Sequence, residues 1–188
     1  LPLRKARYRK VIVMSPPGPF AEAMSAQKYV DWIKVPFVPS RNRRQVGVRQ
    51  VVEAARGADG VVVVASNRYH VAMIQEIVAQ LPNTPTVMLS FASPYYLTSV
   101  PSVDAYVCTY SYRRVAQVAA AEAILGETKM TGRLPVSIPG FYSYGHRVED
   151  RLAGISWLRT LGWDNPNLKL ITPPPHPQLI KYIGYWIL

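Results

Sequence analysis

The side chains best suited to acid–base chemistry are scattered along this 188-residue chain. Hydrolysis by carboxyl groups needs two of them held close together on either side of one bond. The eleven acidic residues offer no such pair at the ends of predicted strands. Asp59 precedes a strand and Glu127 follows a helix, so both are expected to be capping or loop residues. We therefore expect no self-contained hydrolytic site.

The three histidines and the single cysteine are also far apart in the sequence. No set of His, Cys and Asp residues has the spacing of a metal site, so no metal is expected. His70 follows a predicted strand and could contact a ligand, but we expect it to be a surface histidine. His146 and His176 are expected to face solvent. Cys108 lies in an apolar stretch and is expected to be an inert core thiol. Because it is the single cysteine, no intrachain disulfide can form.

Four serines lie at or just beyond the ends of predicted strands: Ser66, Ser90, Ser93 and Ser111. None of them lies in a G-x-S-x-G motif, which disfavours a nucleophile elbow. The chain also lacks a G-x-G-x-x-G loop after its first strand. The Ser15–Pro19 stretch there carries prolines, which remove the backbone amides that would hold a phosphate. A dinucleotide is disfavoured, and no cofactor is expected.

The run from Gly60 to Ser66 is the centre of the predicted fold. It is continuously apolar and β-branched, which is typical of a strand buried on both faces. The polar stretch Asn67–His70 and a helical pattern at Val71–Leu81 follow it. Strand, turn and helix make half of a βαβ unit, and α/β proteins bind their ligands at the carboxyl ends of such strands.

Short apolar strands alternate with helical patterns along most of the chain. Further strands are predicted at Val11–Met14, Val35–Val38, Thr86–Ser90 and Val103–Thr109, and further helices at Phe20–Trp32, Val46–Arg56 and Val115–Leu125. The Val35–Val38 strand would lie at an edge because Pro36 cannot donate to a ladder. Gly126 is expected to end the last helix. This alternation predicts a doubly wound α/β fold, a mostly parallel sheet with helices on both faces in a three-layer sandwich.

The formal net charge is +11, which favours an acidic partner such as nucleic acid, an anionic cell-wall polymer or an acidic protein surface. The densest basic segment, Ser40–Arg44, is expected to be a solvated loop, because no aromatic residues alternate with its charges. Nucleic acid is therefore the less expected partner. No segment reaches the roughly 18 apolar residues of a membrane span, and nothing in the sequence indicates a compartment.

The character of the chain changes after Gly140. We expect one domain over residues 1–146 and a tail of uncertain structure over residues 147–188. The tail contains a short helical pattern, a polyproline-type spacer and an apolar aromatic end: Ile155–Trp163, Thr172–Pro177 and Leu179–Leu188.

Several segments resemble, in order, the C-terminal α/β sandwich domain of family 3 glycoside hydrolases. Glu122–Gly140 is similar to the family's LFGE…SGrLPVSIPG segment. Gly57–Val63, Ser93–Leu97 and Val103–Tyr112 resemble further strand and loop segments, and Leu1–Leu3 resembles the family's interdomain linker. The resemblance covers about residues 1–146 and favours the β-N-acetylhexosaminidase branch. The chain departs from the pattern at two positions, because Tyr96 replaces the usual aspartate and Arg114 stands where proline is common.

The resemblance implies an accessory domain that packs on a catalytic (β/α)8 barrel and shapes the rim of its active site. The barrel would precede Leu1–Leu3, so no catalytic residue is expected in this chain, and the isolated chain is expected to be inactive. The barrel is the implied partner, with carbohydrate as a further one. The candidates for contact with barrel or substrate are Asn67, Arg68, His70, Ser93, Tyr110, Tyr112 and Arg113.

Two of these candidates, Tyr110 and Tyr112, are equally well explained by ordinary packing under the following helix. Two other functions also remain open at this point. One is a freestanding anion- or nucleotide-binding module that uses its strand-end loops and the basic Ser40–Arg44 segment. The other is a truncated or nonfunctional product of the hydrolase.

Overall fold

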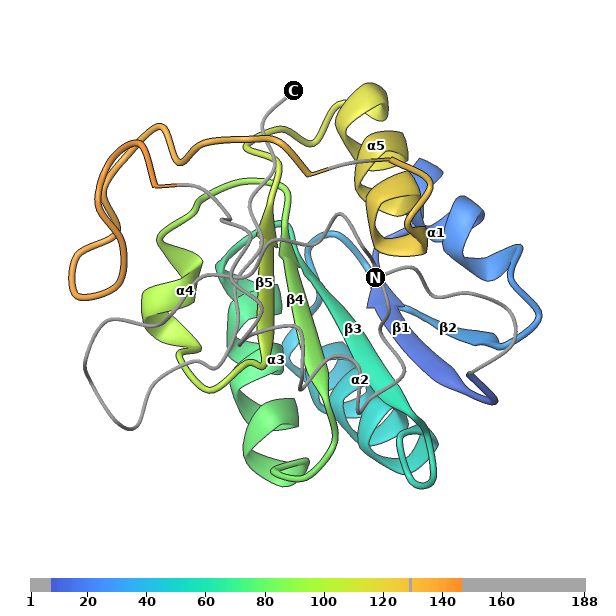
Figure 1. Cartoon of the computed structure of the whole chain (residues 1–188). Coiled ribbons are helices and arrows are strands. Elements are labelled where there is room, and N and C mark those ends of the chain that lie inside the picture. The colour runs from blue at the N-terminus through green and yellow to red at the C-terminus, as the bar shows by residue number, and fades with distance from the viewer. Residues whose placement is uncertain (1–7, 129, 147–188) are drawn as a thin grey trace.

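A computed structural model describes residues 8–128 and 130–146, so the predictions for the tail lie outside the described residues. Strands and helices alternate along the described chain (Figure 1). Their order is β1 (Val11–Ser15), α1 (Pro19–Ser25), β2 (Val30–Lys34), α2 (Arg41–Ala54), β3 (Gly60–Ala65), α3 (Arg68–Gln80), β4 (Thr86–Ser90), α4 (Tyr96–Ser99), β5 (Ala105–Cys108) and α5 (Arg114–Leu125).

The sheet confirms the predicted α/β architecture. All neighbouring strands are parallel, and their order is β2-β1-β3-β4-β5. Helices α1 and α5 pack together on one face, and α2 and α3 pack together on the other. The direction of winding changes between β1 and β3, so the loops after these two strands diverge to opposite faces. In doubly wound sheets this switch point is where a crevice can form outside the carboxyl ends of the strands.

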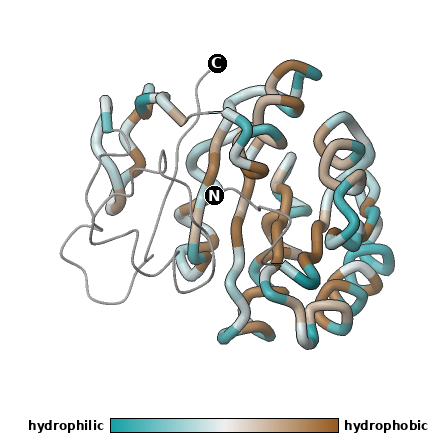
Figure 2. Tube along the Cα trace, turned by 45° about the vertical axis from the view of Figure 1, so that its right-hand side comes forward, coloured by the Kyte–Doolittle hydropathy of each residue, from teal (hydrophilic) through white to brown (hydrophobic). Residues whose placement is uncertain are grey.

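Strand β3 is the centre of the sheet, as its unbroken apolar sequence predicts. All six of its residues are buried. Val62 and Val64 face the α1/α5 side, whereas Val61 and Val63 face the α2/α3 side. Each buried valine contributes roughly 1.5 kcal/mol or more to folding. Strand β3 therefore stabilises the apolar cores on both faces of the sheet. Figure 2 shows the apolar residues concentrated along the strands, with polar residues on the outer helix surfaces.

The prediction for the first helix and the second strand is wrong. The helix ends at Ser25 rather than Trp32, and the strand is Val30–Lys34 rather than Val35–Val38. Strand β2 lies at the edge of the sheet, where Asp31 and Lys34 are exposed, so it lacks the apolar run that marks the inner strands. Its residues instead extend the three-and-four spacing of α1, which imitates a longer helix.

The Ser40–Arg44 and Asn67–His70 segments are not loops but the beginnings of α2 and α3. Ser40 caps α2, with its Oγ accepting a hydrogen bond from the Arg43 N–H at 3.4 Å. Asn67 caps α3, with its Oδ1 accepting from the N–H groups of Tyr69 and His70 at 2.9 and 3.2 Å. Both are favoured N-cap residues, so each helix begins several residues before its apolar periodicity starts.

The predicted end of the last helix is confirmed. Gly126 adopts the left-handed conformation with φ 79°, and its N–H bonds to the Ala123 carbonyl.

Cys108 is a core residue, as predicted: it is fully buried, and burial raises the pKa of its thiol to about 11. Among the helices that the structure describes, none is both long and apolar enough to cross a membrane.

Candidate functional site

A row of aromatic rings joins the loops that follow three different strands at the carboxyl edge of the sheet. Phe37 after β2 meets Tyr112 after β5, with ring centroids 5.1 Å apart. Tyr112 meets Phe91 after β4 at 5.6 Å, and Phe91 meets Phe20 of α1 at 5.7 Å. The three contacts are edge-to-face, a geometry worth about 0.5–1.5 kcal/mol for each pair. Phe37 and Tyr112 remain 45% and 37% exposed, so the outer end of the row is open to a partner.

His70 holds the loop that carries Phe37. The backbone N–H of Ser66 donates to His70 Nδ1 at 3.3 Å, so the ring proton belongs on Nε2, which donates to the Pro36 carbonyl at 3.0 Å. The side chain is fully buried, and burial lowers the pKa of its imidazole. The prediction of a surface histidine is therefore wrong. His70 cannot face a partner directly, because both ring nitrogens already contact backbone groups of this chain.

Asn67 fastens the same loop from the other side. Its Oδ1 caps α3, and its Nδ2 donates to the Phe37 carbonyl. Both ends of the half-buried amide are therefore used within the domain. Together, His70 and Asn67 fix consecutive carbonyl groups of Pro36 and Phe37, so the exposed Phe37 ring projects from an anchored backbone rather than from a free loop.

Arg68 is exposed beside Tyr69 at the first turn of α3. Its Nη2 donates to the Tyr69 hydroxyl at 3.1 Å, and this hydrogen bond lowers the pKa of that phenol. The guanidinium carbon lies 5.0 Å from the Tyr69 ring centroid, and that of Arg44 lies 5.5 Å from it. Two cationic side chains from two helices therefore gather around one ring.

Ser93 belongs to a turn that closes the end of β4. Its Oγ accepts from the Tyr95 N–H at 3.2 Å, and its carbonyl accepts from the hydroxyls of Ser90 and Tyr106 at 2.9 and 3.0 Å. The Tyr106 hydroxyl also lies 3.2 Å from the Pro94 carbonyl. These bonds explain Ser93 as a structural residue of the half-buried turn.

The Tyr110–Arg113 segment divides between core and surface. Tyr110 is half-buried against the α2/α3 core, and burial raises the pKa of its phenol. Its backbone has a positive φ of 57°, which is uncommon for residues other than glycine. Tyr112 belongs to the aromatic row, and its carbonyl accepts from Gln117 Nε2 at 2.8 Å. Arg113 is exposed at the start of α5. The structure thus brings Tyr112 and Arg113 to the surface and places Tyr110 mainly inside.

Two hydroxyls, Ser15 Oγ and Ser66 Oγ, are buried at the ends of β1 and β3 and have no hydrogen-bond partner. His70 cannot activate either of them, because its two nitrogens are engaged elsewhere. Within residues 8–128 and 130–146, no three His, Cys, Asp or Glu side chains lie together so that they could hold a metal ion. Among the described residues, the carboxyl edge presents the exposed side chains of Phe37, Tyr112 and Arg113.

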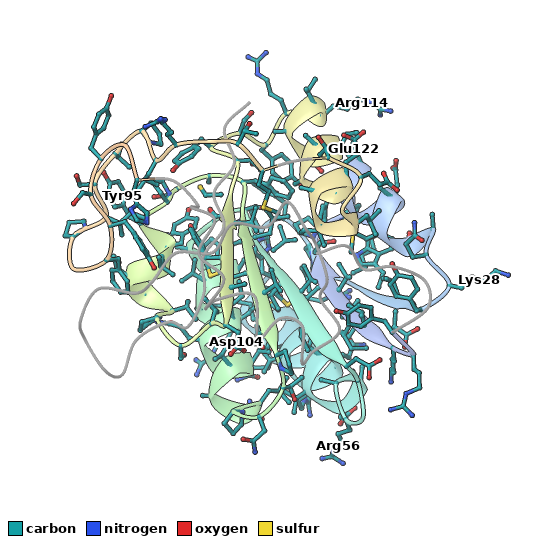
Figure 3. The ribbon with its side chains drawn as sticks, viewed as in Figure 1. Lys28, Arg56, Tyr95, Asp104, Arg114 and Glu122 are labelled. Carbon is teal, nitrogen blue, oxygen red and sulfur yellow. The ribbon has the colours of Figure 1, made fainter. Side chains whose placement is uncertain are left out.

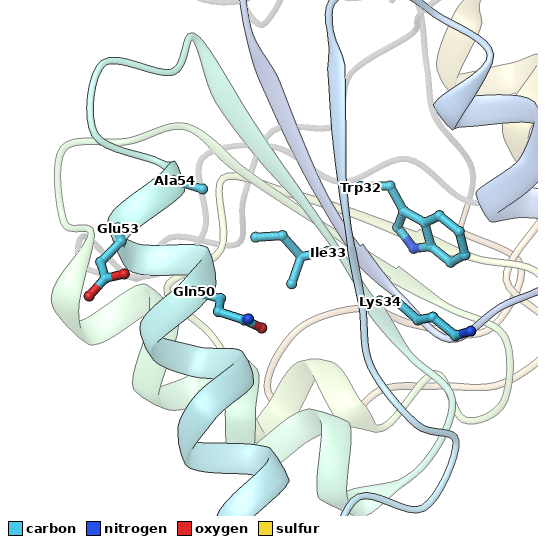
Figure 4. A pocket seen from close by; sticks show the side chains of 6 residues that line it. All are labelled: Trp32, Ile33, Lys34, Gln50, Glu53 and Ala54. Carbon is cyan, nitrogen blue, oxygen red and sulfur yellow. The ribbon is translucent and has the colours of Figure 1, made fainter.

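A separate open groove of about 640 Å³ lies between edge strand β2 and helix α2 (Figure 4). Ile33 points across it towards α2, whereas the Trp32 ring lies on the opposite side of the strand, where its Nε1 reaches the Ser15 carbonyl at 3.3 Å. The lining residues are Trp32, Ile33, Lys34, Gln50, Glu53 and Ala54. Glu53 is the one carboxylate among these six residues.

The sequence did not point to Phe37 or Phe91 as members of a site, and it pointed to Arg44 only as part of the basic Ser40–Arg44 segment of the alternative anion-binding module. Phe37 lies in a segment predicted as a strand, and Arg44 in one predicted as a loop. One signal was present for Phe91: it follows directly after the strand Thr86–Ser90, and a parallel sheet gathers the loops after its strands at one edge.

The comparisons with known proteins identify the fold. No family model matches the chain, and no curated protein matches it by sequence. Among solved structures, it is similar to a fungal multi-domain GH3 β-N-acetylglucosaminidase that contains a GCN5-related glucosamine N-acetyltransferase region. The TM-score is 0.58 at 23% identity, covering 87% of this chain and 21% of that one.

Two further structures carry the same fold. A GH3 β-N-acetylglucosaminidase from Paenibacillus sp. matches with a TM-score of 0.54 at 19% identity, over 67% of this chain and 26% of that one. A GH3 exo-β-xylosidase matches with a TM-score of 0.54 at 17% identity, over 92% of this chain and 27% of that one. The chain spans about a quarter of these enzymes or less, and its fold is that of an α/β portion of glycoside hydrolase family 3 structures.

Proposed function

We propose that this chain is an accessory α/β domain of a family 3 glycoside hydrolase of the β-N-acetylhexosaminidase type. Its carboxyl-edge surface, defined as the loops and helix starts that follow the carboxyl ends of the strands, packs on the catalytic barrel and shapes the rim of the active site. The observation that carries the proposal is the anchored, half-exposed pair Phe37 and Tyr112 at the carboxyl edge. The fold shared with GH3 enzymes supports it.

We propose two different roles for the candidate residues. Arg68, Tyr112 and Arg113 are the proposed contacts with barrel or substrate, because their side chains reach the surface. Asn67, His70, Ser93 and Tyr110 support that surface from below through the hydrogen bonds and packing described above. We also propose the division into a domain over residues 1–146 and a tail over residues 147–188, which limited proteolysis would test.

Activity of the purified chain is the first test. We expect no turnover of an aryl N-acetyl-β-glucosaminide by the 188-residue chain alone. Clear, stable turnover that copurifies with the chain would overturn the accessory assignment.

Complementation is the second test. The barrel of a GH3 β-N-acetylglucosaminidase, expressed without its own α/β portion, would be mixed with this chain, and binding and activity measured. We expect a complex that is weakened by Phe37→Ala and by Tyr112→Ala but not by Arg56→Ala, since Arg56 is exposed at the opposite edge (Figure 3). Circular dichroism of each variant confirms that it is folded. Absence of any complex would contradict the proposal.

One observation favours a second candidate, a freestanding anion- or nucleotide-binding module. The unpartnered hydroxyls of Ser15 and Ser66 lie at the β1/β3 switch point, the place where doubly wound proteins bind phosphorylated ligands. Titration with ADP and with inorganic phosphate, followed by thermal unfolding, tests it. Stabilisation by either ligand that is lost in Ser66→Ala would favour this function over the accessory role.

A further inference from the structure

The three long helices that begin at the carboxyl edge carry arginine where acidic residues are normally favoured. The amino end of a helix has a positive partial charge, which an acidic side chain stabilises. None of α2, α3 and α5 has an acidic residue in its first turn. Instead, their caps and first turns hold Arg41, Arg43, Arg44, Arg68, Arg113 and Arg114.

Nothing within the described chain neutralises these six arginines. The ion pairs among residues 8–128 and 130–146 are Arg9–Asp59 and Lys10–Asp31, and neither involves them. Arg44 and Arg68 contact the Tyr69 ring instead of a carboxylate, and the Arg44 Nε is buried without a hydrogen-bond partner. The positive charge of the edge is therefore uncompensated within the described residues.

The carboxylates lie mostly away from this surface. Asp59 and Asp104 precede β3 and β5, at the opposite edge of the sheet, and both bind backbone N–H groups there. Figure 3 shows Asp104 and Arg56 at one end of the molecule and Arg114 at the other. Glu22, an exposed residue of the short helix α1, is the acidic side chain that follows the end of β1. One carboxylate does not balance six guanidinium groups.

Exposed apolar side chains share the surface with the arginines. Phe37, Val38, Tyr112 and Val115 are 45%, 64%, 37% and 68% exposed. Aromatic residues and arginine are enriched in protein–protein interfaces. A platform for single-stranded nucleic acid instead presents ring faces on which bases stack, whereas Phe37 and Tyr112 meet each other edge to face. The composition favours a polypeptide partner, in keeping with the longer multi-domain chain in which the same fold occurs.

We propose that the carboxyl-edge surface binds an acidic protein face, in which Asp and Glu side chains surround an apolar centre that receives Phe37 and Tyr112. Arginine pairs with carboxylates through two parallel hydrogen bonds, so such a face would neutralise the first turns of α2, α3 and α5 together. This inference rests on the proposed function for the identity of the partner, the catalytic barrel, and adds the chemistry that recognises it.

The test measures the affinity of the full chain for the GH3 barrel at about 50 and about 300 mM NaCl, a range over which exposed charges become strongly screened. We expect affinity to fall by about tenfold or more across that range. The triple variant Arg41→Gln, Arg43→Gln, Arg114→Gln should bind about tenfold more weakly at low salt and lose most of the salt dependence. The matched control Lys28→Gln, Arg49→Gln, Arg56→Gln removes the same charge from other surfaces and should bind like the unaltered chain.

The outcomes separate the two proposals. An affinity for the barrel that does not change with salt concentration, or that falls equally in both triple variants, overturns the acidic-face inference. The accessory role would not be affected by either result. Failure of the unaltered chain to bind the barrel overturns the accessory role itself. Tighter binding of a 20-nucleotide single-stranded DNA than of the barrel, dependent on the same three arginines, would assign the surface to nucleic acid and overturn the inference.

A measurement without any partner completes the test. Because the arginines oppose the helix dipoles, the carboxyl-edge triple variant should unfold at a higher temperature than the unaltered chain, and the control triple should not. A lower unfolding temperature for the carboxyl-edge variant would show that these arginines are satisfied within the chain, and would overturn the inference.

Discussion

At the amino edge of the sheet, carboxylates fasten the backbone, whereas at the carboxyl edge arginines face solvent without them. Asp59 Oδ2 accepts from the N–H groups of Arg9 and Lys10 at 2.7 and 3.0 Å, and Asp104 Oδ2 accepts from Thr86 N–H at 2.9 Å. The Asp59 bonds join the segment before β3 to the segment before β1, and the Asp104 bond joins the segment before β5 to the start of β4. The amino edge is thus organised for stability, and the carboxyl edge for contact with something outside the domain.

The largest expected effect is at the amino edge. Asp104→Ala removes a charged acceptor from the buried Thr86 N–H, so the free energy of unfolding should fall by about 2–3 kcal/mol. Urea denaturation measures this change. Glu76→Ala, an exposed position in α3, is the control and should change stability by less than about 0.5 kcal/mol. Equal losses in the two variants would mean that the amino edge has no special role.

His70 makes the carboxyl edge sensitive to pH. Its folded pKa lies below the ordinary value near 6.5 because of burial, so the unfolded chain binds the proton more readily. Stability should therefore be constant above about pH 7 and fall as the pH drops through 6.5 towards the folded pKa. Protonation also places a proton on Nδ1, facing the Ser66 N–H.

The measurement is thermal unfolding between about pH 8 and about pH 5, a range that spans the ordinary histidine pKa. His70→Gln should be less stable at neutral pH, because the Ser66 and Pro36 bonds are disturbed, but it should lose most of this pH dependence. An unchanged pH profile in the variant would assign the effect to other groups.

A smaller loss is expected where α5 ends near the amino edge. Gly126 has φ 79°, which an alanine side chain disfavours, so Gly126→Ala should destabilise the domain by about 1 kcal/mol. Gly57→Ala, also at positive φ and with open space around it, tests whether backbone conformation alone causes the loss. The two variants should lose similar stability in urea denaturation.

The smallest effect is expected at the switch point between β1 and β3. Ser66→Ala removes a buried hydroxyl that has no partner, so it should change the free energy of unfolding by less than about 0.5 kcal/mol or increase it slightly. Ser90→Ala is the contrast, since the Ser90 hydroxyl bonds to the Ser93 carbonyl at 2.9 Å and should cost about 1 kcal/mol. Loss of stability in Ser66→Ala equal to that in Ser90→Ala would show that Ser66 has a partner in solution.

The inner strands could be predicted because they are buried on both faces and therefore read as apolar runs. Edge strand β2 could not, because Asp31 and Lys34 face solvent and its spacing continues that of α1. The fold needed only the inner strands and the helices between them, which is why its architecture was predictable although one strand was misplaced.

The site was predictable in place but only partly in its members. Parallel strands bring their carboxyl ends to one edge, so the sequence located the edge and named Tyr112 and Arg113. Burial of His70 depends on the Pro36 carbonyl, 34 residues away, which no local pattern reveals. Phe37 was missed for the same reason, since its neighbours His70 and Tyr112 come from a helix and from another loop.

The position of β1 between β2 and β3 has a consequence for biosynthesis. Strand β1 can pair with β2 as soon as both have left the ribosome, but its other side waits for β3, which begins at Gly60. Until then, a strand whose residues are all buried in the finished domain presents an open edge, the kind of surface on which chains aggregate. Nascent chains that stop before β3 should therefore need chaperones, and those that extend past it should not.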